Sequence, residues 1–356
     1  MKAARSSKRQ RPGMARRLGL AFVGATLVLG LPACTDSGSP ATPSAELVTP
    51  QTPIQVDPTA GLHLTIGVAN YSLDSPFLAA IDQGIAAEAA TLGITVVSKD
   101  AGGDAGQLAA DVASFRAEAV DGIIVSGGDL VSAPAVFSAM MDSRISLVLV
   151  DRLFNSGDFT AWIGPDYYSL AYDLGDFVVG VLGGRGNVAV IEGGPKAHPI
   201  GSELTDGVIA GLTRDGSDIE VIEASEFGDW TSQGGERAMT ALLDEHGAID
   251  AVFCQNDAMC LGAQKAAEAA GRSHEMILVA VGGTDQAFAA IRDDTNFAAS
   301  ALIDPYAMGG AAADLMARIL AKQDFSRMAF VQTPRIDARN WEEYFDPARS
   351  LPAVDG

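Results

Sequence analysis

The alternation of two kinds of segment constrains the fold of this chain more than any other feature of its sequence. From Leu62 onward, short apolar segments typical of buried strands alternate with longer amphipathic or alanine-rich segments typical of helices. This alternation indicates βαβ units, in which parallel strands form a sheet with helices on both faces. The strand segments read LTIGVA, ITVVSKD, DGIIVSG and SLVLVD, and then NVAVIEG, IEVIEA, AVFCQN, ILVAVGG and FAASALID. The expected helices lie over 76–92, 107–119, 133–141, 169–182, 202–213, 232–246, 259–270, 285–292 and 306–320.

The two runs of alternation predict two lobes rather than one domain. A chain of 356 residues is long enough for two hydrophobic cores of ordinary size. We expect the α/β fold class, with two doubly wound parallel-sheet lobes and a hinge that the chain crosses three times, near Asp166, Ile303 and Pro334. These crossings assign residues 62–165 and 304–325 to the N-terminal lobe, residues 166–303 and 326–342 to the C-terminal lobe, and residues 343–356 to a tail.

The first 61 residues have the features of an exported protein with a lipid anchor. Seven Lys and Arg residues precede the first acidic residue, and a mostly apolar run follows them over 18–31. That run is too short to span a bilayer and has the layout of a signal peptide. The sequence Leu-Pro-Ala-Cys at 31–34 resembles the lipobox of bacterial lipoproteins, which implies a signal peptide over 1–33 and lipidation of Cys34. Residues 34–61 are rich in Pro, Ser and Thr and predict a disordered tether.

An ordinary signal peptide, cleaved near the same place, is the alternative to the lipobox. Both interpretations place the mature protein outside the cytoplasm, and a lipid on Cys34 would hold it on the cell membrane. The formal net charge of −21 argues against nucleic acid as a partner, because an acidic surface repels phosphate groups.

Cys254 and Cys260 lie close together in the sequence but do not have the pattern of a metal or thiol site. Structural zinc needs four ligands, usually from two closely spaced pairs, and a nucleophilic thiol needs a histidine partner. None of the four histidines adjoins a cysteine in the sequence, so two small buried thiols or a disulfide between them is expected. The chain also lacks the common catalytic and phosphate-binding motifs. We therefore expect no catalytic residues, no metal and no cofactor.

Polar and aromatic side chains gather just after the predicted strands, where open α/β sheets bind ligands. Asp151 and Arg152 suit a polyol, because a carboxylate accepts and a guanidinium donates hydrogen bonds to hydroxyls; the alternative is an ordinary ion pair on a loop. Asp257 is expected to cap the following helix while Asn256 points into the cleft. The candidate ligand-binding residues are Asp74, Ser75, Phe77, Asp151, Arg152, Trp230, Asn256 and Asp304, with weaker support for His198, Ser202 and Asp285.

Several segments together resemble the ribose-binding group of type I sugar-binding proteins of bacterial ABC importers. These segments are LDSPFLAAIDQGI, AVDGIIVSGGD, LVLVDR, GDWTSQGGERAMTALL, AVFCQNDAMCLGAQKAAEAAG and DPYAMGG. The resemblance implies a two-lobed clamp, a buried ligand, and delivery to an ABC permease and its ATPase. It also implies that Phe77 and Trp230 stack on a sugar ring, that Asp151 and Arg152 bind hydroxyls, and that Asn256 contacts the ligand. Either aromatic residue alone could instead fill a core or staple a helix.

Three positions of the second lobe, and Ser75 of the first, depart from the pattern of ribose binders. Leu204, Gly282 and Ile303 stand where the family pattern has arginine, aspartate and glutamine, and Ser75 stands where it has asparagine. Unpaired hydroxyls in a closed site cost about 1–3 kcal/mol each. We therefore expect a ligand that is smaller or less hydroxylated than ribose. Residues that could compensate are Lys196, His198, Ser202, Glu203, Asp285 and Asp304.

The sequence thus predicts an extracytoplasmic solute-binding lipoprotein that captures a sugar or polyol by hinge closure and delivers it to an ABC permease. The alternative is a lipid-anchored sensor that presents bound sugar to a membrane receptor or kinase. Sugar-responsive repressors share the two-lobed clamp, but residues 35–61 are too short and Pro-rich for a DNA-binding head.

Overall fold

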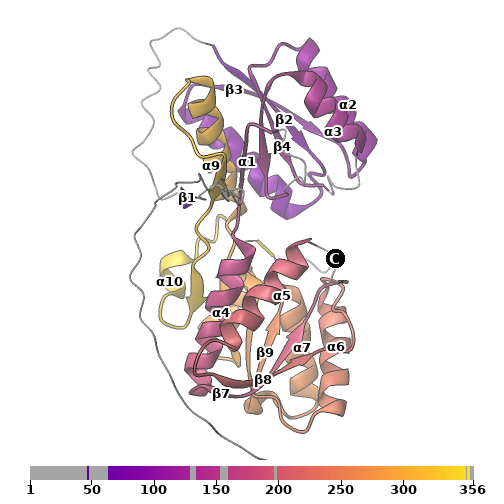
Figure 1. The fold of residues 1–356 in the computed structure, drawn as a ribbon, viewed down its shortest axis with the longest axis vertical. Helices are drawn as coiled ribbons and strands as arrows, with labels where there is room; N and C mark the ends of the chain where they lie inside the picture. Colours follow the sequence, from indigo (N-terminus) through magenta and orange to yellow (C-terminus); the bar gives the residue numbers. More distant parts are fainter. Residues whose placement is uncertain are drawn as a thin grey trace, which may run out of the picture. The chain divides into compact units, whose positions relative to one another are not determined.

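The computed structural model describes residues 46–47, 63–128, 134–152, 159–195, 199–349 and 351–352. The predicted signal peptide over 1–33, the predicted lipidation site Cys34, and Lys196 and His198 all lie outside the described residues. Figure 1 shows two α/β lobes, one formed by each sheet and its helices.

The first sheet is parallel throughout and has the strand order β1-β12-β6-β5-β4-β2-β3. Its strands are β1 (Glu46–Leu47), β2 (Thr65–Asn70), β3 (Thr95–Asp100), β4 (Gly122–Ser126), β5 (Ser146–Val150), β6 (Ala161–Gly164) and β12 (Met328–Phe330). Helices α1 (Pro76–Thr91) and α9 (Pro305–Leu320) pack on one face, and α2 (Ala105–Ala117) and α3 (Pro134–Ser143) on the other. Because both faces are covered, the central strands β4 and β5 are almost wholly apolar and buried.

The second sheet has the order β13-β11-β10-β9-β7-β8 and is parallel except for β13, which pairs antiparallel with β11. Its strands are β7 (Arg185–Ile191), β8 (Asp218–Glu223), β9 (Ala251–Cys254), β10 (Ile277–Gly282), β11 (Phe297–Leu302) and β13 (Arg335–Asp337). Helices α4 (Tyr167–Leu182) and α5 (Pro199–Leu212) cover one face, and α6 (Ser232–Glu245), α7 (Asp257–Ala269) and α8 (Asp285–Arg292) cover the other. The short elements η1 (Ser273–Glu275) and α10 (Trp341–Tyr344) complete this lobe.

The chain passes between the sheets three times, from β6 to α4, from β11 to α9 and from β12 to β13. The predicted fold class is therefore confirmed. Two of the crossings end on an aspartate that caps the next helix: Asp166 accepts from the backbone N–H of Ser169 at 2.9 Å, and Asp304 from that of Ala307 at 2.9 Å. Each carboxylate thereby satisfies a helix-end donor at the point where the chain changes lobe.

The prediction that residues 326–342 belong wholly to the C-terminal lobe is wrong for β12. This strand pairs in parallel with β6 of the first sheet, with Ala329 opposite Ile163, and Ala329 is buried in the first lobe's core. The prediction of a disordered tether over 34–61 is wrong at Glu46–Leu47, which form β1 alongside β12. In both cases a short segment without strand periodicity pairs with the edge of the sheet. This is possible because edge pairing needs only backbone N–H and C=O groups.

Helices α1 and α9 approach each other so closely that only glycine fits between them. A Cβ atom on Gly84 of α1 would lie 2.0 Å from the backbone oxygen of Tyr306 in α9. On the opposite side, a Cβ on Gly309 of α9 would lie 2.0 Å from the backbone oxygen of Ile81. Backbone contact of this kind fixes the N-terminal turn of α9, and with it Tyr306, against the first lobe.

Candidate ligand-binding cleft

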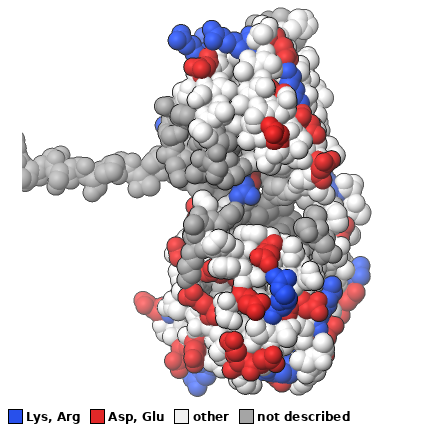
Figure 2. Space-filling model, turned by 90° about the vertical axis from the view of Figure 1, so that its right-hand side faces the viewer, with Lys and Arg blue, Asp and Glu red and all other residues white. Residues whose placement is uncertain are grey.

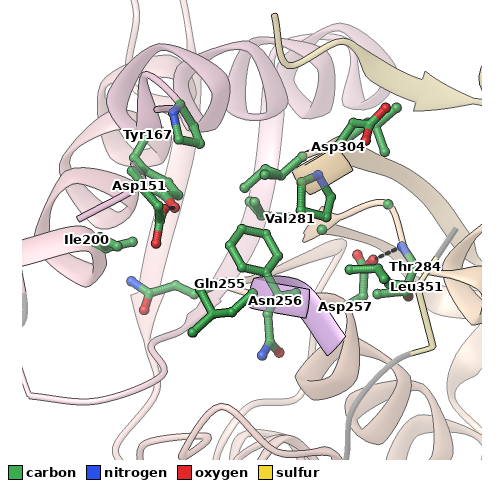
Figure 3. Close-up of a pocket in the computed structure, with 18 of the residues that line it drawn as sticks. Asp151, Tyr167, Ile200, Gln255, Asn256, Asp257, Val281, Thr284, Asp304 and Leu351 are labelled. Carbon is green, nitrogen blue, oxygen red and sulfur yellow. Dashed lines mark hydrogen bonds between the residues drawn. The ribbon is translucent and has the colours of Figure 1, made fainter. Parts of the chain in front are cut away.

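A cavity of about 1510 Å³ lies at the carboxyl ends of strands from both sheets. Residues after β4, β5, β9 and β10 line it, together with the two aspartate-capped crossings. Figure 3 shows side chains from these segments converging on one pocket. Parallel strands deliver their loop residues to the same edge of a sheet, which is why residues distant in sequence meet here.

The structure places seven of the predicted site residues in the lining of this cavity. They are Ser75, Phe77, Asp151, Arg152, Trp230, Asn256 and Asp304. Asp74, Ser202 and Asp285 are described but do not line it. Ser75 and Asp304 also have structural roles, as N-caps of α1 and α9.

Asp151 forms the polar centre of the first-lobe side of the cleft. Its side chain accepts a hydrogen bond from the Tyr167 hydroxyl at 2.7 Å, and the Arg152 Nε lies 3.3 Å from Oδ2. The Trp162 indole donates to the backbone oxygen of Asp151 at 3.2 Å, which helps to hold the residue in a left-handed conformation at φ +67°. Burial raises the pKa of Asp151, and Arg152 and Tyr167 lower it by smaller amounts. The pKa of Tyr167 is raised by burial and by Asp151, so its hydroxyl stays a donor.

Trp230 forms an aromatic side of the cleft and is held in a strained backbone conformation. It has φ +60°, and its backbone oxygen accepts from Asn256 Nδ2 at 3.0 Å. The indole lies against Gly193, where a Cβ atom would come within 2.3 Å of a ring atom. Glycine at 193 therefore makes room for the ring, and Asn256 fixes the backbone that carries it.

The expected roles of Asn256 and Asp257 are corrected by the structure. Helix α7 starts at Asp257, and Asn256 is its N-cap, with Oδ1 accepting from the Met259 N–H at 2.9 Å. Both ends of the Asn256 amide are thus engaged within the protein, and the residue also lines the cavity. Asp257 is not the cap: it is buried and accepts from the Thr284 N–H and the Ser300 hydroxyl, both at 2.7 Å. Asn256 therefore caps α7 with its oxygen and holds the backbone of Trp230 with its nitrogen.

The second-lobe side of the cleft is apolar at the three positions that depart from the ribose-binder pattern. Leu204, Gly282 and Ile303 all line the cavity, and Leu204 and Ile303 are buried. Gly282 has φ +147°, and a Cβ atom there would lie 2.7 Å from Oδ2 of Asp257. An aspartate at 282 would therefore be strained and would meet an existing carboxylate.

Several residues that line the cavity were not among the predicted site residues. Tyr167 bonds to Asp151, and its place directly after the first crossing was the available signal. Gln255 is buried and uses its amide to join Gly193, Gly201 and Thr205, so it positions the loop after β7 against α5. Asp257 was assigned to a cap. The predicted tail also contributes Glu343, Tyr344, Asp346, Arg349, Leu351 and Pro352 to the lining.

Cys254 and Cys260 are both buried free thiols. Burial raises the pKa of Cys260, whose thiol donates to the backbone oxygen of Val279 at 3.4 Å. Within the described ranges, no group of three or more His, Cys, Asp or Glu side chains is placed to hold a metal ion. None of the helices in that part of the chain is long and apolar enough to cross a bilayer.

Charged side chains are interspersed over the face of the molecule in Figure 2, with acidic groups frequent in the half that holds the second sheet. Near the cleft, burial and the neighbouring Asp166 raise the pKa of Glu203. Glu203 lines the cavity, so the apolar second-lobe side has a carboxyl group at its margin.

We expect Asp257→Asn to flatten the pH dependence of stability. Burial raises the pKa of Asp257 above its ordinary value of 3.8, and hydrogen bonds lower it less. A carboxyl group whose pKa is higher in the folded chain contributes stability that is present at low pH and lost as the pH rises through the raised pKa. The free energy of unfolding of the native chain should therefore fall, relative to the variant, from about pH 4 upward. Urea unfolding between pH 4 and 7 measures this, with the exposed Asp294→Asn as control; parallel curves for native chain and Asp257→Asn would contradict it.

Two largely parallel α/β sheets, three crossings and a cavity at their carboxyl edges define a type I periplasmic binding protein. A family model described as a periplasmic binding protein domain matches residues 66–324. The chain therefore belongs to the periplasmic binding protein family, and the resemblance noted from the sequence is confirmed.

Known relatives of the chain include binding proteins of ABC transporters. The chain is 26% identical to the ribose import binding protein RbsB of Bacillus subtilis over 229 residues, which is 64% of this chain and 73% of that protein. A solved ABC transporter solute-binding protein from Mycobacterium smegmatis with bound glycerol is 26% identical, has a TM-score of 0.68, and covers 82% of this chain and 99% of its own. Another, from Bacillus halodurans with bound myo-inositol, is 26% identical with a TM-score of 0.65, covering 79% of this chain and 97% of its own.

Proposed function

We propose that this protein captures a sugar or polyol in the cleft outside the cytoplasm and delivers it to an ABC permease and its ATPase. The observation that carries the proposal is the cavity itself, in which the Asp151, Arg152 and Tyr167 group shares one lining with the aromatic rings of Phe77 and Trp230. A carboxylate and a guanidinium bind hydroxyls in complementary ways, and flat aromatic faces cover the C–H faces of a sugar ring. The relatives that bind ribose, glycerol and myo-inositol support the same ligand class.

The ligand we propose has fewer hydroxyls than ribose on the side that meets the second lobe. Leu204, Gly282 and Ile303 offer no side-chain hydrogen bonds there, so hydroxyls facing them would be desolvated without a partner. A deoxygenated or smaller polyol would place C–H groups against this side instead. Glu203 at the margin supplies an acceptor for one remaining hydroxyl.

Capture would proceed by closure of the two lobes about the three crossings. In the structure Phe77, at the start of α1, packs against core residues of both lobes, so a movement of the lobes changes its surroundings directly. A ligand that contacts both sides of the cleft favours the closed form, because only that form makes all its contacts. The permease would then recognise the closed surface.

The anchor proposed for this protein is a lipid on Cys34, with the segment before it removed as a signal peptide. The apolar run over 18–31 and the Leu-Pro-Ala-Cys sequence support it. Mass spectrometry of the N-terminal peptide of the mature protein tests this proposal, since an unmodified Cys34 would contradict it.

The proposed function is tested by thermal unfolding and calorimetry with a panel of ribose, 2-deoxyribose, glycerol, myo-inositol, glucose and maltose. We expect at least one small member to raise the melting temperature and to reduce the radius of gyration in solution scattering. Ribose as the tightest ligand would overturn the proposal of a less hydroxylated ligand. No binding and no compaction with any member would overturn sugar or polyol capture. A sensor, the alternative, would bind ligand equally well but would leave uptake of that ligand unchanged when its gene is deleted.

A further inference from the structure

The residues after α10 run along the cleft. We call residues 345–349, 351 and 352 the C-terminal strap. Its first residue, Phe345, packs on Phe288 of α8 with ring centroids 5.3 Å apart and on Trp341 of α10 at 6.5 Å. This aromatic cluster starts the strap on the second lobe, next to the lining of the cavity.

The strap is fastened to the N-terminus of α8 by its backbone. The N–H of Asp285 donates to the backbone oxygen of Leu351 at 2.8 Å. The first N–H groups of a helix have no partners within the helix, so this carbonyl satisfies a donor that would otherwise need water. Leu351 accordingly lies beside Thr284 and Asp257 in Figure 3.

Between these two attachments the strap reaches the first lobe. The guanidinium of Arg349 lies over the ring of Tyr306, 4.6 Å from its centroid, and its Nε is 3.4 Å from Oδ2 of Asp346. Tyr306 belongs to α9, whose backbone is in contact with α1 at Gly84. The strap therefore contacts both lobes beside the crossing from β11 to α9.

The strap also supplies part of the cavity lining, through Asp346, Arg349, Leu351 and Pro352. In the view of Figure 3, Leu351 lies on the side of the pocket opposite Asp151 and Tyr167. A ligand that is bound at Asp151 and is long enough to cross the pocket would therefore contact the strap with its other end. The strap is then placed to limit how long a ligand can be.

Building on the proposed function, we propose that the C-terminal strap is a specificity-determining part of the ligand site. It closes the cleft on the α8 side and restricts the ligand to the size of one sugar ring or a small polyol. Arg349 holds the strap in that position by its contact with Tyr306, and the backbone bond to Asp285 holds its end.

The test compares the full chain with a chain that ends at Arg349 and with the full-length Arg349→Ala variant. The shortened chain lacks Leu351 and Pro352, and the point variant removes the contact of Arg349 with Tyr306 together with its ion pair to Asp346. Arg292→Ala is the matched control, because Arg292 is an exposed arginine on α8 that pairs with Asp293 and does not line the cavity. Calorimetry with glycerol, myo-inositol, 2-deoxyribose, maltose and maltotriose gives a ratio of dissociation constants for the longer and the smaller ligands, and thermal unfolding confirms that each chain is folded.

Relative to the small ligands, we expect the shortened chain to bind maltose or maltotriose at least about tenfold more tightly than the full chain does. Arg349→Ala should shift the ratio of dissociation constants in the same direction by about two- to fivefold, the scale of one exposed cation–π contact. Arg292→Ala should leave it unchanged. If the shortened chain does not fold, Arg349→Ala decides the question.

The strap proposal would be overturned if the full chain binds the small probes and both strap variants leave the ratio of dissociation constants unchanged. The proposed function would still stand in that case. A full chain that binds maltotriose as tightly as the small probes would overturn the strap proposal as well. A full chain that binds none of the probes would instead overturn the proposed function, and the strap proposal with it.

Discussion

Replacing Asp151 by asparagine is expected to weaken binding of the tightest small polyol in the panel by about tenfold to a hundredfold. A hydrogen bond to a charged group contributes about 1.5–3 kcal/mol, and each 1.4 kcal/mol is a factor of ten in the dissociation constant. Asparagine keeps the shape of the side chain and can still accept from Tyr167 through Oδ1. It also tolerates the left-handed backbone at φ +67° better than most residues. The variant therefore changes the charge and one acceptor with little change in geometry.

Stability separates this effect from a folding defect. Burial raises the pKa of Asp151, which means that its ionised form is less favourable in the folded chain than in water. Stability linked to Asp151 is present at low pH and is lost as the pH rises through the raised pKa, so a neutral asparagine should not lower the melting temperature at pH 7. Asp294→Asn is the matched control, since Asp294 also has a left-handed backbone, at φ +54°, but does not line the cavity. Calorimetry that finds Asp151→Asn within threefold of the native affinity would remove Asp151 from the ligand site.

The convergence of distant residues on the cleft followed from the strand and helix pattern. Phe77, Asp151, Trp230 and Asn256 come from four separate segments; the sequence predicts the last three just after strands and Phe77 at the start of the first helix, and all four line the cavity. The assignment succeeds because a parallel sheet sends all its strand ends to one edge, so topology alone brings these loops together. Contact of these side chains with a ligand stays a prediction.

The hydrogen-bond partners of the site could not be predicted in the same way. Whether Asn256 or Asp257 caps α7 depends on where the helix begins, and helix ends are uncertain by a residue or more in any sequence pattern. The bond from Asn256 to Trp230 joins segments 26 residues apart and has no local signature. The same holds for Tyr167, whose partner Asp151 lies 16 residues earlier in the sequence.

The position of the strap and the lobe that β12 joins could not be predicted for a different reason. Both are short, and neither shows the periodicity of a strand or helix that would place it on one lobe. Met328–Phe330 joins the first sheet through backbone pairing, and Leu351 is held by a backbone carbonyl. Backbone contacts of this kind do not depend on side-chain type, so the sequence carries little information about them.

Replacing Trp230 by alanine is expected to weaken binding of the same polyol by about thirtyfold or more. Buried aromatic contacts of this kind contribute about 2 kcal/mol or more when they dominate a site, and the truncation would also admit water to the ring's place against Gly193. Trp230→Phe keeps an aromatic face and should lose about tenfold or less. The difference between the two variants isolates the contribution of stacking, because both remove the indole N–H.

The backbone of Trp230 provides a check on this interpretation. It is left-handed at φ +60° and is held by Asn256, so both variants keep the same non-glycine strain and the same bond to the backbone oxygen. Similar melting temperatures for Trp230→Ala and Trp230→Phe would show that the fold of the loop is intact in each. If their affinities were also similar, stacking on this ring would not contribute to ligand binding, and the aromatic side of the cleft would have to be assigned to Phe77 alone.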